Sequence, residues 1–168
     1  MVHSHTWHVL NIVLQHSDEA DDKVAVVLAS LFHDIGNKKC KFRKVTESEI
    51  ARSDNKEQLG RERYAQRIEH MYWGAMRAYD ILNELGFKEQ VVLHVVMMVL
   101  RHDLRKVIDG FKTDCKDLKL LCRADAEWML TEDGITRDIA RSIEQGLEPM
   151  TRGGQLEWNR KVVANQSV

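Results

Sequence analysis

His33 and Asp34 are adjacent side chains with the chemistry of metal ligands. They follow the apolar segment Val24–Phe32 and precede Ile35 and Gly36, so both should lie at the edge of a hydrophobic core. A carboxylate in such a place is costly unless it is compensated, and a divalent cation satisfies a carboxylate and an imidazole together. The alternative is an Asp that caps a helix beside a hydrogen-bonded His. The pair predicts a metal site.

The surrounding sequence, Leu28-Ala-Ser-Leu-Phe-His33-Asp34-Ile-Gly36, closely resembles the signature of the HD-domain superfamily of metal-dependent phosphohydrolases. That family takes its ligands from a His on the first helix, the His-Asp pair and a distant Asp. The resemblance implies His8 as the first ligand, although Asn11 stands where the family usually has Arg. His5, one turn earlier on the same helix, is the alternative; we favour His8. The resemblance implies Asp125 as the last ligand, and its alternative is a partly exposed surface acid.

Two more histidines, His70 and His102, lie on predicted helices. In some relatives such histidines complete a second metal site that the Asp of the pair, here Asp34, bridges. Contact with a substrate phosphate and an ordinary structural role are the alternatives. His94 is a weaker candidate, because eight residues separate it from His102 and place it about 80° away around a helix.

Basic residues follow the His-Asp pair, from Lys38 to Lys44, and continue at Arg61, Arg63, Arg67 and Arg101. A charge run is usually a solvated loop, yet a cation beside a metal site could neutralise a bound phosphate. We take Lys38, Lys39, Arg61 and Arg67 as candidate phosphate contacts.

Apolar residues recur at spacings of three and four, which predicts an all-α fold, a single HD-domain-like bundle of about six helices around the metal site. The expected helices cover residues 6–16, 22–34, 61–85, 88–101, 115–130 and 131–146, with an irregular stretch at 37–59 that includes a short helix near Ser48. Gly36 and Gly86 are expected to end helices. Residues 1–146 are expected to form the metal-binding domain, and residues 147–168 a tail packed on it or extending it.

Composition excludes several classes of protein. The 168 residues include 25 basic and 26 acidic ones, so there is no excess positive charge for nucleic acid. The three cysteines form no CxxC pair, which suits a reducing compartment. The chain shows no membrane-spanning apolar run and no signal-peptide core, so we expect a cytoplasmic protein. The sequence does not indicate an oligomeric state.

The resemblance implies a metal-dependent phosphohydrolase that acts on a nucleotide or another small phosphate ester. The expected cofactor is Mn, Fe, Mg, Ni or Co, as one or two ions. Asp34 would be the catalytic residue, holding metal and orienting or deprotonating the attacking water. Two other functions stay open: an HD-fold di-iron oxygenase, and a non-catalytic ligand-binding module stabilised by metal. The sequence has no glycine-rich phosphate loop, GxSxG elbow or HExxH helix.

Overall fold

The chain folds into α-helices in a computed structural model, which describes residues 2–108 and 110–165. The α-helices are α1 Val2–Gln15, α2 Lys23–Phe32, α3 Glu47–Arg52, α4 Lys56–Glu84, α5 Glu89–Arg101, α6 Lys116–Glu127, α7 Glu132–Glu144 and α8 Arg152–Asn165. Four 3₁₀ turns lie between them, η1 Ser17–Glu19, η2 Ile35–Lys39, η3 Leu104–Lys106 and η4 Trp128–Leu130. The described residues contain no strand, which confirms the all-α prediction. Helix α3 is the short helix expected near Ser48, and with α8 the described residues contain eight α-helices, slightly more than the six expected.

Side-chain caps and glycines fix several helix ends. Asp22 accepts a hydrogen bond from the backbone N–H of Ala25 at the start of α2. Thr46 and Thr131 cap α3 and α7 in the same way. Gly86 follows α4 with a φ of 74°, a left-handed conformation that glycine adopts without strain, as predicted.

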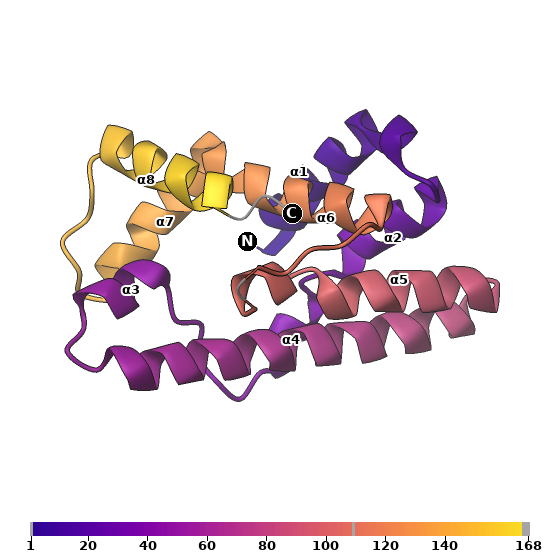
Figure 1. Ribbon diagram of the computed structural model, residues 1–168, viewed down its shortest axis with the longest axis horizontal. Coiled ribbons are helices and arrows are strands. Elements are labelled where there is room, and N and C mark those ends of the chain that lie inside the picture. The colour runs from indigo at the N-terminus through magenta and orange to yellow at the C-terminus, as the bar shows by residue number, and fades with distance from the viewer. Residues whose placement is uncertain (1, 109, 166–168) are drawn as a thin grey trace.

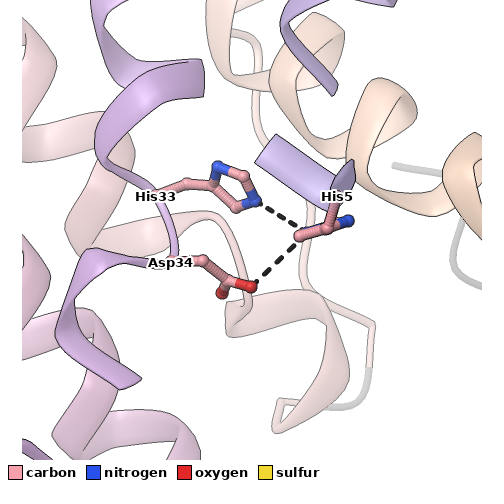
Figure 2. A group of neighbouring side chains, drawn as sticks. All are labelled: His5, His33 and Asp34. Carbon is pink, nitrogen blue, oxygen red and sulfur yellow. Dashed lines mark hydrogen bonds and ion pairs between the residues drawn. The ribbon is translucent and has the colours of Figure 1, made fainter. Parts of the chain in front are cut away.

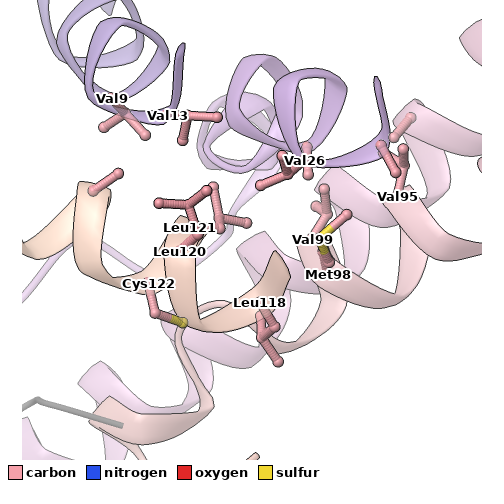
Figure 3. Packing of buried hydrophobic residues seen from close by; sticks show 14 of the residues in the cluster. Val9, Val13, Val26, Val95, Met98, Val99, Leu118, Leu120, Leu121 and Cys122 are labelled. Carbon is pink, nitrogen blue, oxygen red and sulfur yellow. The ribbon is translucent and has the colours of Figure 1, made fainter. Parts of the chain in front are cut away.

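The hydrophobic core lies where α1, α2, α5 and α6 converge. Valines of α1, α2 and α5 meet Leu118 and Leu121 of α6, and these two leucines are fully buried (Figure 3). The C-terminal half of the long helix α4 packs beside α5 (Figure 1). The carboxylate of Asp117 accepts hydrogen bonds from the backbone N–H groups of Asp21 and Asp22, which joins the start of α6 to the start of α2.

Helices α7 and α8 lie together at the end of the molecule where α3 and the beginning of α4 are also found (Figure 1). Asn159 of α8 is buried and donates from its side-chain amide to the Met129 carbonyl oxygen and to Asp138 of α7. The segment expected as a weakly patterned tail therefore contains a helix that packs on α7. No helix in the described part of the chain is both long and apolar enough to cross a membrane.

Gly36 has a different role from the predicted helix stop. It lies inside η2, it is buried, and its φ is not positive. A Cβ added at Gly36 would lie 2.0 Å from the His70 carbonyl oxygen and 2.5 Å from the Gly74 backbone nitrogen. Only glycine therefore lets η2 approach the backbone of α4 this closely. This contact brings the end of α2 next to His70.

Candidate metal centre

His33 stands at the centre of a cluster of imidazoles and carboxylates. It caps the C-terminal end of α2 and is fully buried. Its Nδ1 lies 2.8 Å from the Ser30 carbonyl oxygen, which can only accept a hydrogen bond, so Nδ1 carries the proton. The lone pair of a neutral His33 is then on Nε2. A ligating histidine is commonly held in this way, with one nitrogen hydrogen-bonded and the other turned to the metal.

His5, and not His8, joins His33 from α1. The Nε2 of His5 lies 3.0 Å from His33 Nε2 and 3.4 Å from Asp34 Oδ2 (Figure 2). It also lies 3.3 Å from Asp125 Oδ1. His8 instead contacts Asp133 of α7 at the surface, with 3.1 Å between Nε2 and Oδ2. We favoured His8 over His5 as the first ligand, but the structure places the His5 ring in the cluster and the His8 ring at the surface. His5 is 40° from the buried Val9 around an ideal helix, whereas His8 is 100° from it.

The second half of the cluster comes from α4 and α5. The Nε2 atoms of His70 and His102 are 3.2 Å apart, and both rings are buried. Nδ1 of His70 donates to the Gln66 carbonyl oxygen at 3.3 Å, and Nδ1 of His102 donates to that of Val99 at 2.7 Å. Both neutral rings therefore point an Nε2 lone pair at the other. Two facing lone pairs repel each other unless a cation lies between or beside them.

The same conclusion follows from the protonation of these two rings. Burial lowers the pKa of His102 to about 3 and also lowers the pKa of His70, despite the nearby carboxylates. At neutral pH neither ring takes up the proton that would relieve the repulsion. The facing Nε2 atoms of His70 and His102 are therefore suited to bind a metal cation. Together with the nearby carboxylate oxygens they form a donor set that suits Mn, Fe, Co or Ni.

Asp34 lies between the two halves of the cluster. Its Oδ2 faces His5, and its Oδ1 lies 3.8 Å from Nε2 of His70. Ligand atoms of His5, His33 and Asp34 fall within 4.8 Å of one another, and so do those of Asp34, His70 and His102. Burial raises the pKa of Asp34, but His33, Lys44 and His5 outweigh it and hold the pKa below its usual range. Asp34 is thus an anion whose two oxygens face different histidines, and it would contribute to a metal site on either side.

Asp125 is held on the other side of the cluster by cations. Its Oδ1 faces His5, while its Oδ2 accepts from Lys106 at 2.8 Å and from Arg105 at 3.2 Å. Burial raises the pKa of Asp125, and Lys106 together with the hydrogen bond from His5 lowers it well below its usual range. One oxygen is thus fixed by the protein and the other is turned to the histidines.

A model of the HD domain family matches residues 2–126, which is most of the chain and includes every residue of the cluster described above. The chain belongs to the HD domain family. Neither the curated proteins nor the solved structures contain a match to it. Membership places the chain in a superfamily of mostly metal-dependent phosphohydrolases, and the histidine and aspartate groups of this HD domain could hold metal.

Asp103 is a buried acid of the HD domain that sequence reasoning missed. It pairs with Arg67 and Lys106, and its Oδ2 lies 3.5 Å from His70 Nε2. Burial raises its pKa, but Arg67 and Lys106 hold the pKa well below the usual range. A signal was present, because His102-Asp103 repeats the His33-Asp34 dipeptide at the end of another helix.

A pocket opens over the cluster and includes His5, Asp34, Asp103 and Asp125 among its lining residues. Its cationic lining residues are Lys44, Arg63, Arg67, Lys106, Arg137 and Arg141. Of the predicted phosphate contacts, only Arg67 lines the pocket. Lys39 lies over the Trp73 ring, Arg61 pairs with Glu57 on the surface, and Lys38 is exposed away from the pocket. Lys38 and Lys39 follow the close approach of η2 to α4, which directs them elsewhere.

Proposed function

We propose that this HD domain is a metal-dependent phosphohydrolase that acts on a small phosphate ester, with a nucleotide as the leading candidate. The observation that carries the proposal is the arrangement of the two imidazole pairs around Asp34. Four Nε2 atoms converge on a carboxylate whose two oxygens face different pairs. Such a set has room for two cations, although one ion held by His5, His33, Asp34 and Asp125 is sufficient for the chemistry.

The lining of the pocket supports an anionic substrate. Arg67 is largely buried, and burial would lower its pKa, but the ion pair with Asp103 raises the pKa above its usual value. Its guanidinium is therefore permanently charged and held at the pocket wall. A phosphate bound over the cluster would lie against this charge.

The residues of the site then have separate roles. A bound divalent cation lowers the pKa of a coordinated water and polarises a phosphoryl oxygen. His33 and His5 would offer their Nε2 atoms as metal ligands. Asp34, an anion at neutral pH, is placed to hold metal and to accept a hydrogen bond from the attacking water. Asp125 completes the set, and Lys106 fixes its orientation.

The test is metal analysis of purified protein followed by a phosphate-release screen over nucleotides and other phosphate esters with Mn²⁺. The His33→Ala variant should lose metal and phosphate release together, and Asp34→Ala should do the same. His16→Ala is the matched control, because His16 pairs with Glu19 on the surface, away from the pocket. Full phosphate release by Asp34→Ala would refute the assignment. Oxygen consumption with Fe²⁺ and no phosphate release would point to an oxygenase instead.

A further inference from the structure

The pocket extends beyond the metal centre onto helices that lie outside the matched family residues. The matched region ends at residue 126, and the outer wall of the pocket comes from η4, α7 and α8. Arg137 and Arg141 of α7 line this wall, and Lys44 from the loop before α3 lines it as well. We call these three residues the outer basic cluster. The cluster has no part in holding metal.

The outer basic cluster carries more positive charge than nearby carboxylates neutralise, since Asp138 is its one salt-bridge partner among the described residues. Neither Lys44 nor Arg137 forms a salt bridge with a carboxylate within residues 2–108 and 110–165. Arg141 has one such partner, Asp138, at 3.5 Å. Asp138 also accepts a hydrogen bond from Asn159 at 3.1 Å, so its negative charge is shared. Burial, and then repulsion from Arg137 and Arg67, lowers the pKa of Arg141. Like charges so close together are expected where an anion binds.

The neutral polar side chains of this wall already donate within the protein. The hydroxyl of Ser142 donates to the Asp138 carbonyl oxygen, and the Gln155 amide donates to Asn159. The Asn159 amide donates to the Met129 carbonyl oxygen and to Asp138. The guanidinium and ammonium groups are therefore the charged donors of this wall, and the buried indole N–H of Trp128, which has no hydrogen-bond partner among the described residues, is a further donor. Arginine in particular binds phosphate and carboxylate oxygens through paired N–H groups.

The distance to the metal centre suits a single small molecule. The Trp128 ring lies 4.6 Å from the His5 ring and 5.7 Å from the guanidinium of Arg137, so that guanidinium is no more than about 10 Å from the His5 ring. Trp128 is buried, and its contact with both groups fixes their relative positions. One ligand can therefore reach the metal ligands and the outer basic cluster at once.

We propose that the outer basic cluster binds a second anionic group of the substrate, so that the preferred substrates carry a phosphate or carboxylate in addition to the phosphate that is hydrolysed. This inference rests on the proposed function, because it assigns the other end of the substrate to the metal centre. Simple monophosphates are then poor substrates. The second anion contributes chiefly to binding, which appears in KM more than in kcat.

The experiment compares matched pairs of compounds on metal-loaded protein. The pairs are adenosine 3′,5′-bisphosphate with adenosine 5′-monophosphate, fructose 1,6-bisphosphate with fructose 6-phosphate, and 3-phosphoglycerate with glycerol 3-phosphate. The last pair tests a carboxylate, and the others test a phosphate. Phosphate release gives kcat/KM, and calorimetry on the same samples gives the dissociation constant. At least one pair should favour the doubly anionic compound by about 10- to 100-fold, the usual range for charge-assisted hydrogen bonds.

Arg137→Gln and Arg141→Gln should remove most of that preference while leaving the singly anionic compound almost unchanged. Arg160→Gln is the matched control, since Arg160 is exposed on α8 and does not line the pocket. Equal affinity for both members of every pair would overturn the inference, and so would arginine variants that weaken both members alike. The proposed function fails separately, if no compound releases phosphate. A preference seen in calorimetry without phosphate release would keep the subsite and reject the hydrolase.

Discussion

Replacing His5 and His8 one at a time separates the two possible first ligands of the metal centre. His5→Ala removes the Nε2 that lies within 3.5 Å of His33, Asp34 and Asp125. His8→Ala removes a ring that is 38% exposed in its side chain and contacts Asp133, itself 61% exposed. The two changes delete the same chemical group from the same helix. They differ only in which face of α1 the group occupies.

The expected magnitudes differ widely. Losing a residue that only orients a metal ligand weakens metal affinity by about 10- to 100-fold, so loss of a ligand itself should weaken it by at least about 100-fold, which corresponds to roughly 3 kcal/mol. The surface pair of His8 with Asp133 contributes at most about 1 kcal/mol to stability and nothing to metal affinity. His5→Ala should therefore lose metal on dialysis against a chelator that the wild type and His8→Ala resist.

The assay is competition for Mn²⁺ or Fe²⁺ against a chelator of known affinity, with metal content measured by mass spectrometry. Circular dichroism of each variant in the metal-free form confirms that the helices are intact. If His8→Ala lost metal and His5→Ala retained it, the placement of α1 against α2 and α6 would be wrong. If both retained metal, the N-terminal helix would contribute no ligand.

Three further outcomes follow from the structure. Gly36→Ala should lower the free energy of unfolding in urea by at least about 1–3 kcal/mol, because the new Cβ would clash with the α4 backbone. Gly60→Ala is the control, and since the space around Gly60 is open, it should raise the free energy of unfolding by about 0.5–1 kcal/mol. Equal effects of the two changes would exclude the close approach of η2 to α4. The lowered pKa of His102, about 3 against 6.5, means that the unfolded state binds the proton first as pH falls, so stability is full above pH 6.5 and decreases toward pH 3. Between pH 7.5 and pH 5, the titration of His102 should therefore lower the free energy of unfolding of the metal-free protein by about 2 kcal/mol. His102→Asn should remove this contribution, and an unchanged pH dependence of stability in the variant would contradict the lowered pKa. Burial raises the pKa of the Cys122 thiol from 9.0 to about 11, which lowers the fraction of reactive thiolate. Alkylation of Cys122 at pH 8, measured by peptide mass spectrometry, should therefore be at least about 100-fold slower in folded than in unfolded protein. Rapid labelling of the folded protein would refute this.

Sequence patterns predicted much of this molecule correctly. The three- and four-residue spacing of apolar side chains gave the all-α class, and Gly86 marked the end of α4. The resemblance around His33 and Asp34 gave the family, which the family model confirms. The helix spacing, the helix end at Gly86 and the motif around His33 and Asp34 each depend on residues that are close together in the sequence. A single sequence is enough to read them.

Other features required the packing of distant segments. His5 and His8 are the same residue type on one helix, and only the position of α1 against α2 and α6 shows which ring is buried. Lys38 and Lys39 were chosen because they follow the His-Asp pair in sequence, yet they do not line the pocket, whereas Lys44 and the predicted Arg67 do. Asp103 was overlooked because its ion pair with Arg67 joins the residue that precedes η3 to α4, and 36 residues separate the two.

By itself the sequence determined the helical class and the chemical character of the candidate metal ligands His33 and Asp34, because helix formation and ligand chemistry depend on residue types and short spacings. Tertiary structure decided which imidazoles meet at Asp34. It also brought Arg137 and Arg141 of α7, which lie outside the family match, to the pocket of the metal centre. These contacts join residues that are far apart in the chain, and no local pattern encodes the distance between them.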